Sequence, residues 1–155
     1  NVPSGDTILH HLSKEPYQVL EQGFDETLTE LMQKARKHRL FTHPVVVAID
    51  FTDIEWYGED LPYIIHSQQK NGTNRFIRFA SPGIVEDGNH FIVKILPVTP
   101  LSSKENIVTR LIQYAHQLVD IRVILSDRGF YTGNVIHTID DQDSLSFRLF
   151  ERGIP

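Results

Sequence analysis

The 155-residue sequence contains no cysteine, which excludes disulfide bonds and thiolate metal sites. No apolar run reaches the roughly 18 residues of a membrane span, and no secretory signal is visible, so we expect no membrane association. The formal net charge of −5 argues against a protein that binds nucleic acid over its whole surface, although a local basic patch can still do so. The length and the 40% hydrophobic content are typical of one globular domain with a sizeable core.

The apolar pattern predicts a helical N-terminal segment over residues 1–43, followed by a domain over residues 44–155. Apolar residues recur at helical spacing after Asp25, which we predict to be an N-cap. These apolar residues are Leu28, Leu31, Met32 and Ala35. The helix ends in the basic run KARKHR, residues 34–39. Cations are favoured at a helix C-terminus, and the same run can instead contact phosphate, so both interpretations stay open.

Two continuous apolar runs, PVVVAID and IRVILSD, are typical of strands covered on both faces. Between them comes a polar loop with a turn at Asn71-Gly72. RFIRFA and HFIVKILPV then flank the turn EDGN, whose Asp87-Gly88 pair is a strong hairpin signal. We expect a bulge or break at Pro82-Gly83, in the first arm of this hairpin.

A helix is predicted between the hairpin and the second apolar strand. Ser102 and Glu105 have the spacing of a capping box. An apolar stripe follows at helical spacing and consists of Ile107, Val108, Leu111, Ile112, Ala115, Leu118 and Val119. After the second strand, YTGNVIHTI is predicted to start another helix. The predicted order is therefore strand, two-stranded hairpin, helix, strand and helix.

Each of the two apolar strands ends in an aspartate, Asp50 in the first and Asp127 in the second. If the strands are parallel neighbours, both carboxylates emerge at the edge where open α/β sheets bind ligands. Two facing carboxylates repel unless a cation lies between them, and Mg²⁺ prefers such oxygen ligands. The pair therefore favours metal-assisted phosphodiester chemistry. The alternative is that each aspartate is a helix N-cap or a turn residue.

The element order, with acids ending the first and fourth strands, resembles the RNase H-like core, an α/β fold with a mixed sheet in β-β-β-α-β-α order. Within that fold, VVVAIDFTDIEWYG followed by VILSDRGFY is similar to the cut-and-paste insertion-element transposases of the DDE type. The opening VPSGDTILHHL is also similar to the opening segment of such transposases, as a helical lead-in. The resemblance therefore spans nearly the whole chain.

The resemblance implies that Asp50 and Asp127 are catalytic, metal-holding members of an acidic triad, with two Mg²⁺ or Mn²⁺ ions per complete site. It implies DNA strand cleavage and strand transfer at the ends of a transposable element, with water or a DNA 3′-hydroxyl as nucleophile. The implied partners are element-end and target DNA and other copies of the chain on that DNA, with no small organic cofactor. The implied location is the cytoplasm of a prokaryote, in association with the nucleoid.

The third acid of such a triad is a glutamate within a downstream Tyr-x2-Arg-x3-Glu-x6-Lys pattern, which no stretch of this chain matches. The acids after Asp127 are Asp140, Asp141, Asp143 and Glu151. We do not expect Glu151 to serve, because LFERGIP is typical of the approach to the next core strand. We expect a parent protein that continues past Pro155, so that this piece ends before the last strand and the catalytic helix.

DNA contacts are predicted among cations and aromatic residues near these motifs, because cations follow a DNA backbone and aromatic rings can stack on a flipped base. The predicted contacts are Arg128, Lys70, Arg75, Arg78, Lys34, Arg36, Lys37, Arg39, Trp56 and Tyr57. Asp53 follows Asp50 at an odd spacing, so we expect it to point to the opposite face of the strand.

Two other functions stay open. A DNA-binding or assembly module that has lost its chemistry would explain the unmatched third acid. A haloacid-dehalogenase-like phosphatase also places an aspartate at the end of its first strand. That chemistry needs a second aspartate two positions later, where this sequence has Thr52.

Overall fold

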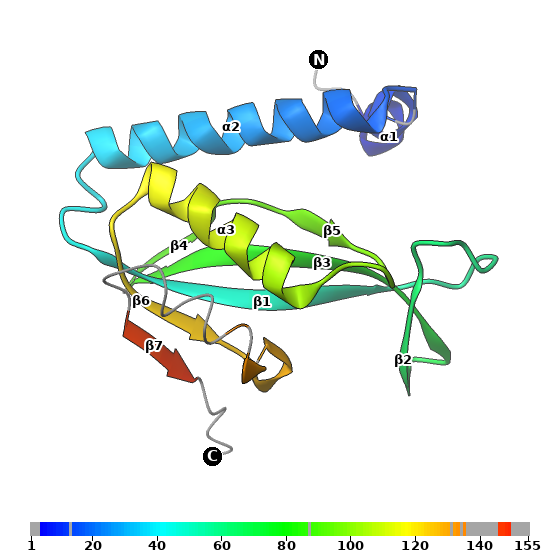
Figure 1. Ribbon diagram of the computed structural model, residues 1–155. Helices are drawn as coiled ribbons and strands as arrows, with labels where there is room; N and C mark the ends of the chain where they lie inside the picture. Colours follow the sequence, from blue (N-terminus) through cyan, green and yellow to red (C-terminus); the bar gives the residue numbers. More distant parts are fainter. Residues whose placement is uncertain are drawn as a thin grey trace.

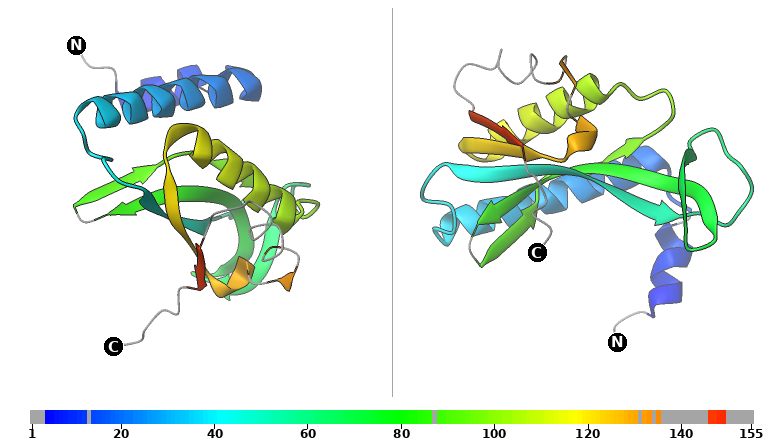
Figure 2. Two further views of the ribbon diagram at one scale, coloured as in Figure 1. Left: turned by 60° about the vertical axis from the view of Figure 1, so that its left-hand side comes forward. Right: turned by 90° about the horizontal axis from the view of Figure 1, so that it is seen from below.

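The computed structural model describes residues 4–12, 14–86, 88–130, 132, 133, 135 and 146–149. Its helices are α1 (Gly5–Leu12), α2 (Tyr17–Lys37), α3 (Lys104–Leu118) and a short 3₁₀ helix, η1 (Arg128–Phe130). Its strands are β1 (Val45–Glu55), β2 (Ile65–Lys70), β3 (Thr73–Glu86), β4 (Asn89–Ile92), β5 (Leu96–Val98), β6 (Ile121–Ser126) and β7 (Ser146–Leu149). Helices α2 and α3 lie on the same side of the sheet (Figures 1 and 2).

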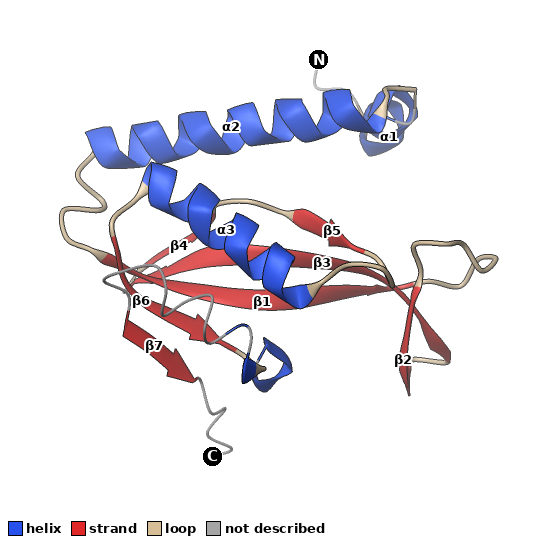
Figure 3. Cartoon of the chain, viewed as in Figure 1, coloured by secondary structure: helices blue, strands red, loops and turns tan. Residues whose placement is uncertain are grey.

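The strands form one mixed sheet in the order β2-β3-β1-β6-β7, and β4 and β5 both pair with β3. β1 is antiparallel to β3 and parallel to β6, which in turn is parallel to β7 (Figure 3). The predicted mixed α/β class is therefore present. Two strands, β2 and β7, were not predicted from the sequence.

The sheet has a buried face beneath α3 and a more open face on the other side. In β1, Val45, Val47 and Ile49 are at most 2% exposed, and they belong to one core cluster with the apolar stripe of α3. The alternate side chains Val46 and Ala48 are half-buried, and Asp50 is exposed. We call the side that carries these three alternate residues the open face.

Two predicted helix caps are wrong. Helix α2 begins at Tyr17, directly after Pro16, so Asp25 lies within the helix and its carboxylate binds Lys94 instead. Helix α3 is capped by Ser103, whose Oγ accepts a hydrogen bond from the Asn106 N–H, one residue later than predicted. The apolar stripe behind that cap is confirmed, because its residues from Ile107 to Ala115 are buried. In α2, Leu28, Met32 and Ala35 are buried, whereas Leu31 is exposed.

The predicted hairpin is confirmed as β3 and β4, with Gly88 at a φ of 76° in the turn and Asp87 outside the described residues. β3 itself continues through Pro82 and Gly83, so the bulge or break predicted there is not in this strand. The interruption lies in the partner instead, between β4 and β5, where the Val93 N–H donates to the Pro82 carbonyl at 3.0 Å. In an antiparallel strand, the N and C=O of one residue point to the same neighbouring strand. The nitrogen of Pro82, which carries no hydrogen, therefore faces this interruption.

The predicted polar loop before the hairpin contains β2, which is joined to β3 by a two-residue turn. Both turn residues have positive φ, 50° at Asn71 and 85° at Gly72, as a tight hairpin turn requires. The helix predicted from YTGNVIHTI lies largely outside the described residues. The division at residue 43 stays a prediction.

Candidate functional site

Asp50 lies on β1, and Asp127 directly follows the neighbouring parallel strand β6. The pairing of β1 with β6 runs as far as Ile49 and Ser126. Asp50 follows Ile49, and Asp127 follows Ser126. Both aspartates line a hollow of about 220 Å³. The rest of its lining is Ala48, Ile49, Val85, Leu125 and Ser126. The structure therefore brings together the two carboxylates that the sequence singles out.

The expectation that the first strand ends at Asp50 is wrong. β1 continues to Glu55, because β3 remains paired with it as far as Phe76. β6 ends at Ser126, so the second half of β1 has no β6 neighbour. Asp50 thus lies in the middle of a long strand, beside the point where the adjacent strand stops.

This arrangement orients the carboxylate of Asp50. Its Oδ1 accepts a hydrogen bond from the N–H of Phe51 at 2.8 Å. N–H groups alternate between the two sides of a strand, and that of Trp56 points to β3, where it bonds the carbonyl of Arg75. The Phe51 N–H therefore points to the other side, past the end of β6. Asp50 satisfies this donor with its own side chain, which directs its carboxylate toward the Asp127 side.

Asp127 is positioned by the turn that leads into η1. Its carbonyl accepts a hydrogen bond from the Phe130 N–H at 3.0 Å. Phe130 is fully buried and stacks on Phe51 with ring centroids 4.1 Å apart. Lys104 anchors the same turn by donating to the Gly129 carbonyl at 2.7 Å. Asp127 also precedes a helical turn, so its interpretation as a cap or turn residue remains open.

The two carboxylates are hard oxygen donors and fit the ligand preference of Mg²⁺ or Mn²⁺. Among the described residues, no group of three His, Cys, Asp or Glu side chains is placed to hold a metal ion. The described part of the site therefore supplies a pair of acids and no triad.

Ser126 also belongs to the site, although it was not predicted from the sequence; its hydroxyl is buried and has no hydrogen-bond partner within the described part of the chain. It lines the same hollow as Asp50 and Asp127. The signal was a polar residue at the end of the apolar run IRVILS, directly before Asp127. The roles of Lys104 and of the Phe51 N–H have no comparable sequence signal, because both depend on where β6 ends.

Asp53 and Arg78 form an ion pair away from the hollow. The Nε and Nη2 atoms of Arg78 donate to the two carboxylate oxygens of Asp53 at 2.6 and 2.7 Å. This hydrogen bonding raises the pKa of the Arg78 guanidinium, which also lies 5.1 Å from the centroid of the Phe51 ring. Asp53 thus points to the face opposite Asp50, as its odd spacing predicts. The donors of Arg78 are directed at Asp53, and its DNA contact stays a prediction.

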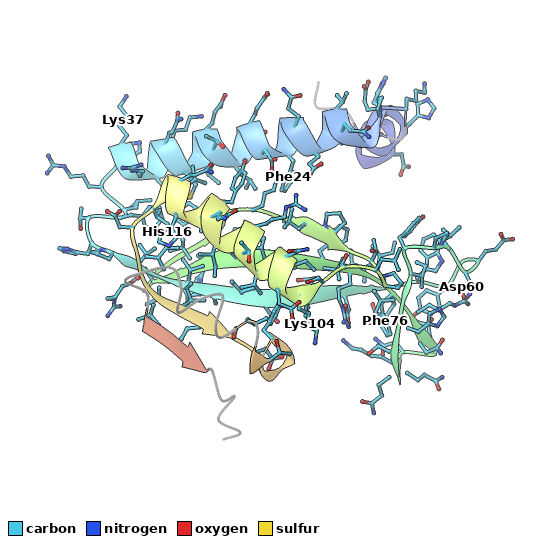
Figure 4. All side chains as sticks on the ribbon, in the orientation of Figure 1. Phe24, Lys37, Asp60, Phe76, Lys104 and His116 are labelled. Atoms are coloured by element: carbon cyan, nitrogen blue, oxygen red, sulfur yellow. The ribbon has the colours of Figure 1, made fainter. Side chains whose placement is uncertain are left out.

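Four other predicted DNA contacts lie at the end of the sheet that carries β2, where Figure 4 labels Asp60 and Phe76. Tyr57 is 64% exposed and donates through its hydroxyl to the Asn71 carbonyl at 2.9 Å. Trp56 is half-buried, and its Nε1 donates to a backbone carbonyl. Lys70 lies 4.0 Å from Glu55, and Arg75 pairs with His66 across β2 and β3. Each is roughly 15 Å or more from Asp50 along the strands.

The basic run lies at the opposite end of the sheet, where Figure 4 labels Lys37. Arg36 donates through Nη1 to the Leu118 carbonyl at 3.3 Å, which agrees with the interpretation of cations at helix C-termini. Lys34, Lys37 and Arg39 are exposed. The side chain of Arg128 lies outside the described residues, so its role stays a prediction.

No helix in the described part of the chain combines the length and the apolar character needed to cross a bilayer.

No protein-family model matches the chain, and no curated protein sequence matches it significantly. Among solved structures, the chain is similar to piggyBac transposase in a synaptic complex with hairpin DNA, with a TM-score of 0.51 and 14% identity. The fold is transposase-like. That similarity covers 90% of this chain and 31% of the piggyBac chain, so this chain spans less than a third of that protein.

Two Mos1 transposase structures are also similar at a lower level. The paired-end complex with the left transposon end gives a TM-score of 0.39 at 12% identity, covering 88% of this chain and 43% of that chain. The strand transfer complex gives a TM-score of 0.35 at 9% identity, covering 89% of this chain and 43% of that chain. The transposase-like fold agrees with the coarser part of the resemblance noted from the sequence.

Proposed function

We propose that this chain is a catalytic-core portion of a DDE transposase of the insertion-element type, with an RNase H-like core. One observation carries the proposal: Asp50 and Asp127 line one hollow at the end of β6, in a transposase-like fold. The reaction would be cleavage of DNA strands at element ends, followed by strand transfer into target DNA. The third acid would come from outside the described residues.

In this proposal Asp50 and Asp127 would hold Mg²⁺ or Mn²⁺. When bound, such an ion acts as a Lewis acid and lowers the pKa of a coordinated water. The residues of this chain would orient the two carboxylates. The Phe51 N–H restrains one oxygen of Asp50, and the buried stack of Phe130 on Phe51 holds the turn that carries Asp127. Both aspartates are exposed, so a phosphodiester can reach them.

DNA is the proposed substrate and partner, with further copies of the chain assembled on it. The piggyBac structure contains hairpin DNA, and its fold is similar to that of this chain. The predicted DNA contacts fall on both sides of the hollow. Tyr57, Lys70 and Arg75 lie toward the β2 end, and the basic run of residues 34–39 lies toward the other end.

A DNA-binding module without chemistry is the second candidate function. The observation that favours it is the pair of acids in place of a triad within the described residues. The phosphatase alternative gains nothing from the structure, because Thr52 is exposed on the open face two residues after Asp50 and offers a hydroxyl where an acid is needed.

Manganese titration followed by NMR separates the two candidates. Mn²⁺ broadens nearby amide signals, so we expect selective broadening at Ala48, Phe51 and Leu125, which surround the hollow. The variant Asp127→Asn should lose this broadening. The matched control Glu59→Gln, which removes an exposed acid at the β2 end, should retain it. An absence of selective broadening at millimolar Mn²⁺ would favour the module without chemistry.

A further inference from the structure

Exposed basic residues gather at the end of the sheet where β1 begins. Lys34 and Lys37 lie in the last turn of α2, and Arg39 follows it. His43 precedes β1, and Arg122 lies on β6. All five side chains are exposed, and none of them has an ion pair with a described residue. We call this group the basic end.

Contacts between distant segments bring the group together. The Val45 N–H donates to the Asp120 carbonyl at 2.8 Å, which ties the start of β1 to the start of β6. The bond from Arg36 to the Leu118 carbonyl ties the end of α2 to the end of α3. Figure 4 accordingly labels Lys37 and His116 at the same end of the molecule.

Arg122 occupies a special backbone position. Val45 pairs with Ile121 and Val46 pairs with Val123, so Arg122 is the extra residue of a β-bulge. Bulges re-aim a side chain relative to a regular ladder. Arg122 lines a hollow of about 480 Å³, which it shares with Leu40, Phe41, Thr42, His43, Pro44, Val45 and Glu86.

Two acids lie at this end, Glu86 in the lining of the hollow and Asp120 directly before β6, and they balance only part of the positive charge. The sequence from Leu31 to Ile49 contains neither Asp nor Glu, in a chain whose formal net charge is −5. Glu86 lines the hollow, and its Oε1 accepts the Val46 N–H at 2.8 Å. The preference of cations for helix C-termini explains Arg36, but it does not explain Arg122, which lies on a strand.

We propose that the basic end binds the phosphate backbone of duplex DNA, with Arg122 as a contact that the bulge positions. The proposal rests on the proposed function and extends the DNA path beyond the aspartate hollow. Arg122 and Asp127 are five residues apart on one extended segment, which is about 16 Å. This distance corresponds to about five base pairs at about 3.4 Å each, so one duplex can cover both places.

The test measures duplex binding by fluorescence anisotropy at several salt concentrations, without divalent metal. Arg122→Gln and Lys37→Gln should each weaken binding severalfold at low salt and reduce the slope of log affinity against log salt by about 1. The matched control Arg110→Gln removes an exposed cation from α3, beside Lys94 and away from the basic end, and should leave the slope unchanged. Circular dichroism checks that each variant is folded, and Lys37→Glu on the exposed helix surface should weaken binding further.

Wild-type binding and slope in both Arg122→Gln and Lys37→Gln would overturn the proposal, as would tighter binding to duplex RNA or to polyglutamate than to DNA. These outcomes are distinguishable from a failure of the proposed function. The manganese titration addresses Asp50 and Asp127 without DNA, whereas the salt series addresses the basic end without metal.

Discussion

The buried ion pairs of Lys94 stabilise the packing of α2 against the rest of the protein, and their contribution to the free energy of unfolding can be predicted. Lys94 is 5% exposed and lies between α2 and α3. Its Nζ donates to the Asp25 carboxylate, lies 3.9 Å from Glu21 and lies 4.6 Å from the centroid of the Tyr114 ring. A buried ion pair is expensive to break from one side only, because the remaining charge stays in the protein interior.

The two partners differ in how well water can reach them. The side chain of Lys94 is 7% exposed and that of Asp25 is 22% exposed. Asp25→Asn removes the nearer carboxylate and leaves the buried ammonium with Glu21 at 3.9 Å and the Tyr114 ring, and we expect a loss of about 3 kcal/mol in the free energy of unfolding. Lys94→Met keeps the apolar stem and leaves a carboxylate that water can reach, so we expect about 1–2 kcal/mol. The double variant should cost less than the sum by about 1–2 kcal/mol.

Urea unfolding followed by circular dichroism measures these free energies for the single and double variants. Glu30→Gln is the matched control, because it removes an exposed acid from the same helix. We expect the control to stay within about 0.5 kcal/mol of the wild type. The reasoning is refuted if Lys94→Met costs as much as Asp25→Asn, or if the two losses add without coupling.

Three further predictions follow from local contacts. Ser103→Ala should cost about 1 kcal/mol in chemical denaturation. Ser103→Thr should retain most of the wild-type stability, because its hydroxyl can also accept the Asn106 N–H and donate to Glu105; equal losses in the two variants would contradict the cap. Phe130→Ala should cost about 3–5 kcal/mol by the same assay, because this ring is fully buried against Phe51, and a loss below about 1 kcal/mol would contradict that packing. The pKa of Arg78 is raised in the folded protein. The stability that its ion pair with Asp53 contributes is therefore fully present below the pKa of the unfolded state, and it is lost only as the pH rises through the pKa of the folded state. The stability difference between wild type and Arg78→Gln should therefore stay constant from neutral pH to about pH 10 in urea unfolding at several pH values, and a decline in that range would contradict it.

Several features of the fold were predictable because their signals are local. The Asp87-Gly88 pair predicted the β3–β4 hairpin, and the apolar stripe after Ser103 predicted α3. The juxtaposition of Asp50 and Asp127 was predicted from two apolar runs that end alike, on the condition that the two strands are parallel neighbours, and the structure meets that condition.

The features that were missed depend on contacts between distant segments. β2 has no apolar alternation, because every residue after Ile65 is exposed, and it becomes a strand only through pairing with β3. The sequence does not reveal the role of Asp25, because its partner, Lys94, lies 69 residues away. The bulge at Arg122 and the continuation of β1 past Asp50 likewise depend on the register with other strands.

The central proposal is that Asp50 and Asp127 hold one metal site together. The most direct measurement is Mn²⁺ affinity by calorimetry for the wild type, Asp50→Asn, Asp127→Asn and the double variant, with Glu59→Gln as control. If the two carboxylates share one site, each single variant should abolish most of the binding, and the double variant should lose little more. Independent, additive losses, or single variants that bind as tightly as the wild type, would contradict the claim.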